Sequence, residues 1–134
     1  EGTDERIIED IWALAEKLGF GHLQLSTPQQ HDHIIAYTSQ LAHIASSAYI
    51  KSPEALRQRG FSAGSFRDMT RVAFMDEDMW TELFLLNADY LTGQVHLLIE
   101  NLKEYEQALQ NRDKEQLRAL LKDGREKKTQ AGGN

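Results

Sequence analysis

The hydrophobic positions of the first 26 residues predict one helix followed by one short strand. Apolar side chains recur at three- and four-residue spacing from Ile7 to Leu18, which is the period of an amphipathic helix. After Gly19, residues 21–26 alternate between apolar and polar with period two, so we expect a short strand there. A single strand cannot satisfy its own backbone groups. We therefore expect residues 1–26 to be the end of a larger α/β domain whose other strands lie upstream.

From residue 27 the spacing becomes helical throughout. Thr27 and Pro28 suit the cap and first position of a helix, whose stripe of mostly small residues continues until Pro53. A glycine- and serine-rich turn at residues 60–71 leads into another helical start. Residues 77–110 then predict one helix roughly 50 Å long, too long to be covered by the core of so small a chain. Its apolar positions form a heptad seam that needs a partner: Phe84, Ala88, Leu91, Val95, Leu98, Leu102, Tyr105 and Leu109.

A last short helix follows Asp113 and is predicted to end at Gly124, so that residues 124–134 form a flexible tail or linker. The predicted fold class is mainly α. It consists of a helical domain over residues 27–123, preceded by the last helix and strand of a truncated α/β domain at residues 1–26.

Composition narrows the classes of partner. The chain has 134 residues, enough for one domain with a core, and a net charge of −6 argues against nucleic acid or anionic membranes as general partners. No apolar run approaches the ~20 residues needed to cross a bilayer. The absence of cysteine suits a reducing cytoplasm, where we expect the protein to act. Residue 1 is not methionine and is interpreted as a cut end.

Histidines and other polar residues interrupt the apolar run HDHIIAYTSQLAHI, residues 31–44. His31 and His43 would lie ~18 Å apart along one helix, too far to share a metal ion. We therefore expect no metal site. Ser39 and His43 are one helical turn apart and face the same way, so they form either a satisfied core pair or part of a ligand site. Asp32 is expected to support the first turn of its helix by its charge.

Positive charge gathers at residues 51–71. Five basic residues and two acidic ones give this segment a charge of +3. Arg67 and Arg71 are four positions apart, on one helical face, so their guanidinium groups could converge on a small anion such as a carboxylate. The alternative is that they pair on the surface with the acids of residues 76–78. Asp68 could hold Arg71 in place, and Trp80 in such a position is most often a core anchor.

Three ordered motifs resemble the C-terminal half of bacterial prephenate dehydrogenases: HDHIIAYTSQLAH, AGSFRDMTR and DEDMW. The resemblance implies that residues 1–26 end a Rossmann-like nucleotide domain and that the helical remainder forms a homodimer. It implies an enzyme that oxidises prephenate with NAD or NADP and releases carbon dioxide, giving 4-hydroxyphenylpyruvate in tyrosine biosynthesis. No GxGxxG cofactor loop is present, so we expect this chain alone to be inactive and assign no catalytic residue within it.

The resemblance also assigns roles to individual residues. Arg71 matches the arginine that clamps a substrate carboxylate, and His43 matches a histidine that lines the substrate pocket. Further matches are Ser39 and His31 in the helix motif, Gly64 where backbone approaches the substrate, Asp68 where an acid orients the site, and Trp80 where an aromatic ring packs nearby. Departures from the family pattern are Gln40 and Ala42, for its His and Pro, and Ala63 and Ser65, for two of its three glycines.

These departures leave the choice between prephenate and arogenate open. A further alternative is a non-catalytic helical oligomerisation module. Such a module would have no need to direct Arg67 and Arg71 toward one point beside Ser39 and His43, and this feature favours the enzyme.

Overall fold

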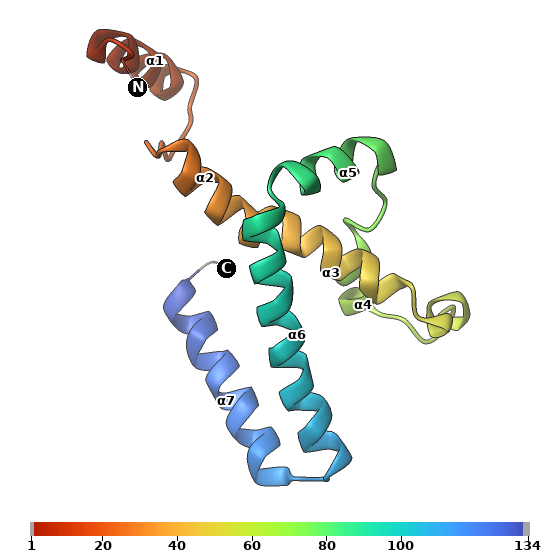
Figure 1. The fold of residues 1–134 in the computed structure, drawn as a ribbon. Coiled ribbons are helices and arrows are strands. Elements are labelled where there is room, and N and C mark those ends of the chain that lie inside the picture. The colour runs from red at the N-terminus through yellow and green to blue at the C-terminus, as the bar shows by residue number, and fades with distance from the viewer. Residues whose placement is uncertain (1, 133–134) are drawn as a thin grey trace. The chain divides into compact units, whose positions relative to one another are not determined.

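The structure is a computed structural model that describes residues 2–132, and these residues form helices joined by short connections (Figure 1). The predicted mainly α fold class is confirmed, and no described residue lies in a strand. The α-helices are α1 (Glu5–Lys17), α2 (Pro28–Ile35), α3 (Leu41–Ile50), α4 (Gly64–Thr70), α5 (Glu77–Leu86), α6 (Ala88–Gln110) and α7 (Lys114–Ala131). A π-helical segment, η1 (Ala36–Gln40), joins α2 to α3, and a 3₁₀ segment, η2 (Pro53–Arg57), follows α3.

The chain divides into two compact units, one up to His31 and one from Asp32 onward. In the first unit, the Asp4 carboxylate accepts a hydrogen bond from the backbone N–H of Arg6 and caps α1. The apolar face of α1 and the side chains of Leu23 and Leu25 line a shallow hollow of about 290 Å³. The first unit therefore keeps an incompletely covered apolar face.

The strand predicted at residues 21–26 is not formed. A strand requires a neighbour whose amide and carbonyl groups complete the ladder of hydrogen bonds. None of the described residues supplies such a neighbour. Leu23 and Leu25 line the hollow beside α1, but so does Gln24 between them, and the predicted alternation of faces is therefore not seen there.

The core of the second unit lies where η1 and α3 meet α6. Its buried residues are Ala36, Leu41 and Leu91, and the half-buried Ile44, Phe84, Val95 and Leu98 pack around them. Ala36 has no side chain beyond Cβ, so η1 approaches α6 closely at this point. The core thus joins η1 and α3 to α6.

Helices α6 and α7 lie side by side as a hairpin (Figure 1). The connection reverses the chain within three residues, and Arg112 adopts a positive φ of 52° to make the turn. Asp113 then caps α7 by accepting a hydrogen bond from the backbone N–H of Gln116 at 2.9 Å. Ala108 is almost fully buried near this turn.

The single helix predicted over residues 77–110 is wrong, because the chain breaks at Asn87. Asn87 has φ −117° and ψ 23°, outside the helical region, and α5 and α6 run in different directions on its two sides (Figure 1). The Asn87 side chain donates hydrogen bonds to groups in other segments, which stabilises the break. The predicted seam spans this break: Phe84 before it and Leu91, Val95 and Leu98 after it pack in the core, whereas Leu102 and Leu109 are exposed.

The predicted helix end at Gly124 is also wrong, because α7 continues to Ala131. Two side-chain pairs at i,i+4 spacing bracket the glycine, Lys122 with Glu126 and Lys127 with Asp123. Residues 124–131 are consequently helical, whereas residues 133–134 lie outside the described residues. None of the helices in the described part of the chain has the length and apolarity to cross a membrane.

Candidate functional site

The motif HDHIIAYTSQLAHI lies on α2, η1 and α3, and its centre is the π-helical segment. π-helical turns are rare and are frequently found at functional sites. Ser39 and Gln40 belong to this segment, and His43 lies in the first turn of α3. The sequence motif and the irregular backbone therefore coincide.

His43 is oriented by its own helix. Its Nδ1 atom lies 2.9 Å from the backbone oxygen of Ser39. Because a carbonyl oxygen can only accept, Nδ1 donates this bond, and in the neutral ring Nε2 is the remaining acceptor. The predicted contact between Ser39 and His43 is thus made, but through the serine backbone instead of its hydroxyl.

Trp80 stacks on His43, with ring centroids 4.0 Å apart and the planes inclined by 30°. Trp80 lies in the first turns of α5, which Asp76 caps by accepting a hydrogen bond from the Met79 backbone N–H at 2.8 Å. Trp80 also contacts Phe84, one turn further along, at 5.3 Å between ring centroids. Two of the residues predicted for the site, on different helices, are brought together in this way.

Four further predicted residues lie on α4 or at its C-terminal end, and α4 packs against α3. Tyr49 and Phe66 form part of this packing, with ring centroids 6.1 Å apart. Gly64 is the first residue of α4 and Arg71 is its C-terminal cap. The second unit therefore places α4, with Gly64, Arg67, Asp68 and Arg71, against the same helix that carries His43.

Arg67 and Arg71 are exposed, and neither forms an ion pair with another described residue. The predicted pairing of Arg71 with Asp68 and the alternative pairing with the acids of residues 76–78 are both absent from the described part of the chain. No hydrogen bond joins either arginine to His43. The two guanidinium groups are therefore available to an anion.

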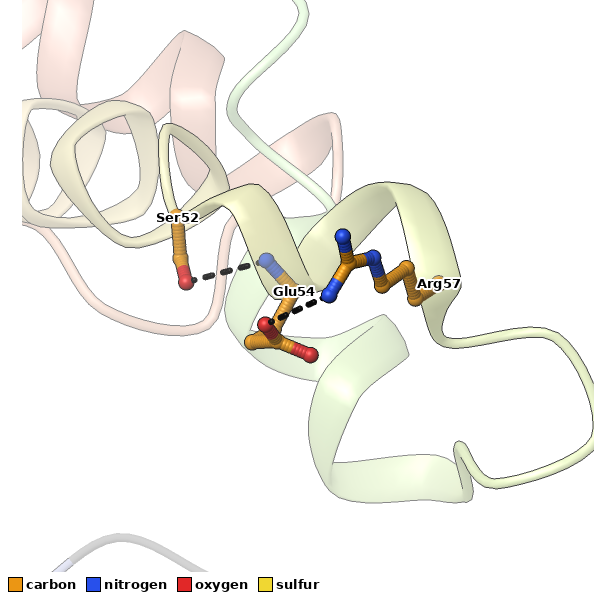
Figure 2. A network of polar contacts seen from close by, with 3 residues as sticks. All are labelled: Ser52, Glu54 and Arg57. Atoms are coloured by element: carbon orange, nitrogen blue, oxygen red, sulfur yellow. Dashed lines mark hydrogen bonds and ion pairs between the residues drawn. The ribbon is translucent and has the colours of Figure 1, made fainter.

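A neighbouring hollow of about 730 Å³ lies among the end of α3, η2 and the start of α4. Aromatic rings of Tyr49, Phe61 and Phe66 line it together with Ser52 and Ser62. Figure 2 shows three polar residues of its lining, Ser52, Glu54 and Arg57. The Ser52 hydroxyl accepts from the Glu54 backbone N–H, and Arg57 pairs with Glu54 at 3.5 Å. Arg57 is one of the five basic residues of residues 51–71, and its charge is thus already paired with that of Glu54.

His31 and Asp32, also predicted from the motif, lie in α2. The backbone N–H of His31 donates to the Thr27 carbonyl at 2.9 Å, and the Asp32 carbonyl accepts from the Asn87 side chain at 2.9 Å. Asp32 therefore contributes at least its backbone to the second unit. Among residues 2–132, no group of three or more His, Cys, Asp and Glu side chains is arranged to hold a metal ion.

Gln40 and Asn87 were not predicted as part of the site, yet their side chains form a hydrogen bond that joins η1 to the start of α6. The Asn87 amide donates to Gln40 Oε1 at 2.8 Å, and Gln40 Nε2 donates to the Leu83 carbonyl at 3.3 Å. The sequence offered two signals for this pair. Gln40 is a polar residue within a mostly apolar helical segment, and Asn87 is an asparagine inside the long helix that was predicted. Neither pattern reveals which partner a side chain will find.

Comparison with known proteins places these features in a family. Residues 27–123 match the family described as prephenate dehydrogenase, dimerization domain. Cyclohexadienyl dehydrogenase of Zymomonas mobilis is 35% identical over 113 residues, 79% of this chain and 37% of that protein. Prephenate dehydrogenase of Bacillus subtilis is 24% identical over 120 residues, 86% of this chain and 32% of that protein. The chain thus spans about a third of the length of these relatives.

Two solved structures share the fold. Arogenate dehydrogenase of Synechocystis superposes with a TM-score of 0.78 at 23% identity, over 98% of this chain and 50% of that one. Prephenate dehydrogenase of A. aeolicus, in complex with hydroxyphenyl propionate and NAD⁺, gives a TM-score of 0.78 at 24% identity, over 97% and 47%. The family match covers most of the chain, including His43, Arg71 and Trp80. The chain belongs to the prephenate dehydrogenase family and contains its dimerization domain.

Proposed function

We propose that this chain is the substrate-binding and dimerisation part of an NAD(P)-dependent prephenate dehydrogenase. The observation that carries the proposal is the stack of His43 on Trp80 beside a helix that bears two unpaired arginines. An aromatic ring, an oriented imidazole and guanidinium groups are the chemistry needed to bind a cyclic dicarboxylate. The family match and the relatives' names support this substrate class.

In the proposed reaction, prephenate loses a hydride from its ring carbinol carbon and its ring carboxylate leaves as carbon dioxide. The electron pair of the breaking carbon–carbon bond completes the aromatic ring of 4-hydroxyphenylpyruvate. A nicotinamide cofactor, when bound to the complete enzyme, would supply the hydride acceptor. The residues of this chain include no glycine-rich cofactor loop, so their proposed part is to bind and orient the substrate.

Arg71, assisted by Arg67, binds a substrate carboxylate in this proposal. A guanidinium group can form two parallel hydrogen bonds with a carboxylate, which fixes orientation as well as position. Asp68 lies between the two arginines on α4 and limits the local positive charge. The exposed pair would approach the substrate from the α4 side, while the His43–Trp80 stack forms the other wall.

Gly64 is proposed to give the substrate room. A Cβ added at Gly64 would meet no atom within 4 Å, so packing within this chain does not require a glycine. A close approach of a ligand to the backbone would provide the reason for one. Ser39 and His31 remain proposed pocket residues through the motif that they share with His43.

We also propose that the chain forms a homodimer through the α6–α7 hairpin. Large apolar side chains are exposed on this hairpin, namely Leu97, Ile99, Leu102, Leu109 and Leu121. Such a surface is typical of an interface, and a two-fold axis would pair identical patches. The test is the sizing of the chain at micromolar concentration. We expect the parent chain to be a dimer and the double variant Leu102→Glu, Leu109→Glu to be a monomer. A monomeric parent chain would contradict the proposal.

Residues 1–26 are proposed to complete a Rossmann-like nucleotide domain, with the apolar face of α1 covered by its sheet. The complete enzyme would then act in the cytoplasm with NAD or NADP. Arogenate is the alternative substrate, since one structural relative is an arogenate dehydrogenase. A non-catalytic helical oligomerisation module is the second alternative, favoured by the exposed hairpin alone.

The experiment that tests this function is an assay of the complete gene product with prephenate and with arogenate, each under NAD and under NADP. Nicotinamide reduction should depend on one of the two substrates, and its product should be 4-hydroxyphenylpyruvate if that substrate is prephenate. Reduction only with arogenate would select the alternative substrate. No reduction under any of the four conditions, from a folded dimer, would favour the oligomerisation module.

A further inference from the structure

A buried amide lies three residues before His43 in the chain. Gln40 is only 7% exposed, although it sits in the irregular segment η1. Both ends of its side-chain amide are bonded: Oε1 accepts from Asn87, and Nε2 donates to the Leu83 carbonyl. Buried amides cost free energy unless they are satisfied, and the network of Gln40 therefore holds its partners in defined places.

Asn87 is the second member of this network and marks the break between α5 and α6. Its Nδ2 group donates two hydrogen bonds, one to Gln40 and one to the Asp32 carbonyl at 2.9 Å. Asp32 lies in α2, Gln40 in η1, and Leu83 in α5. The two side chains thus tie both the end of α5 and its junction with α6 to the chain segment that leads into His43.

Helix α5 has few other attachments. None of its residues is buried, and Leu85 and Leu86 are 71% and 85% exposed. Phe84 packs on the core, and Trp80 contacts His43. A helix with so little buried apolar surface is weakly fixed by packing, so a few directional hydrogen bonds have a large share in its position.

We propose that Gln40 and Asn87 are a positioning pair that fixes α5 so that Trp80 stays stacked on His43. The hydrogen bonds of the pair go to backbone groups and to each other, so the pair acts through the end of α5. Its importance for substrate binding rests on the proposed function, whereas its effect on Trp80 does not. This separation allows the two proposals to fail independently.

The first experiment measures the accessibility of Trp80 in the 134-residue chain. The chain has two tryptophans, so a Trp12→Phe background leaves Trp80 as the only one. Gln40→Met keeps the length of the side chain and removes both amide bonds, while Asn87→Asp replaces the donor by an acceptor. Each should raise the acrylamide quenching constant of Trp80 emission about twofold and shift the emission to longer wavelength, because α5 moves away from His43. The matched control is Gln107→Met on α6, an exposed glutamine, which should change neither quantity.

Helicity by circular dichroism, measured in parallel, shows whether each variant is folded. If a folded Gln40→Met or Asn87→Asp chain keeps the parent quenching constant, the positioning role is overturned, even where its melting temperature falls. Gln40→Asn serves if Gln40→Met does not fold. It keeps an amide but is one methylene too short to reach both partners, so it should raise quenching, and parent-like quenching would also overturn the proposal.

The second experiment uses the complete enzyme and its substrate. Gln40→Met should raise KM for the substrate several-fold with a smaller change in kcat, because the pair positions a binding wall and does not touch reacting atoms. A fall in kcat alone would overturn this role. If the parent enzyme has no dehydrogenase activity, the proposed function fails, and the quenching result still decides the positioning role.

Discussion

The α6–α7 hairpin and the segment from η1 to α5 are built in different ways. The hairpin consists of two long regular helices with side-chain pairs one turn apart, and Asp113 caps the start of α7. The other segment contains a π turn, a 3₁₀ turn, a seven-residue helix and the break at Asn87. Every residue proposed to contact substrate, apart from His31 in α2, lies in the second segment. In the proposed function, local departures from helical regularity would direct side chains toward the substrate, whereas the regular part would supply the surface for association.

The core between these regions offers the largest expected effect on stability. Leu91→Ala removes a residue that is 4% exposed and packs against Ala36 and Leu41. The loss of buried apolar contact and the cavity left behind should lower the free energy of unfolding by about 2–5 kcal/mol. Denaturant unfolding at a fixed protein concentration measures the change.

The control for this substitution is Leu97→Ala, on the same helix but 56% exposed. If the chain is kept below the concentration at which it associates, this change should be within about 0.5 kcal/mol of the parent. Equal losses for both variants would mean that the core does not join η1 to α6 as described.

An intermediate effect is expected at Gly124, inside α7. Gly124→Ala should raise the free energy of unfolding by about 0.5–1 kcal/mol, because alanine loses less backbone entropy in a helix interior. A Cβ at this position would lie 3.9 Å from the Tyr105 hydroxyl oxygen, an ordinary contact. Thermal unfolding of parent and variant checks the prediction. An unchanged stability would indicate that residues beyond Gly124 are not helical. The flexible tail predicted from the sequence would then be the correct description.

The smallest effect is expected at an exposed ion pair of the hairpin. The Lys103 ammonium donates to the Glu100 carboxylate at 2.8 Å and holds the pKa of Glu100 below its usual value. Because the pKa is lowered in the folded state, the stabilisation is present above the ordinary carboxyl pKa of 4.5 and disappears as pH falls through the lowered value. The pair is solvent-exposed and therefore weak.

Glu100→Gln should accordingly lower the melting temperature slightly at pH 7 and leave it unchanged near pH 2. Unfolding scans at the two pH values measure the difference. A larger loss at the acidic pH than at pH 7 would contradict the sign of this linkage.

Helical periodicity predicted much of the fold because most helices here follow simple amphipathic spacing. The helical region after Thr27 and the close approach of small residues to another helix both appear in the structure. The resemblance to the family motifs predicted His43 and Trp80 as site residues, and their two rings are in contact in the structure. The motif therefore named two residues that the fold brings into contact, and their role in binding substrate stays a prediction.

The remaining features depend on distant partners. Asn87 breaks a helix whose heptad spacing is uninterrupted, because its amide bonds to Gln40, 47 positions away in the sequence. A one-dimensional pattern carries no information about such a partner. The strand expected at residues 21–26 failed for the related reason that its ladder requires a neighbour. Gly124 remained helical because flanking side-chain pairs outweigh one unfavourable residue.

The comparison of the two regions is tested most directly by one kinetic measurement on the complete gene product. Arg71→Ala removes a guanidinium of the proposed substrate site, and Arg118→Ala removes one from the exposed face of α7. Loss of a charge-assisted hydrogen bond should raise KM for prephenate about 10-fold to 100-fold in Arg71→Ala, with a smaller change in kcat. Arg118→Ala should retain the parent KM. Equal KM values for the parent and Arg71→Ala would contradict the assignment of substrate binding to the irregular segment.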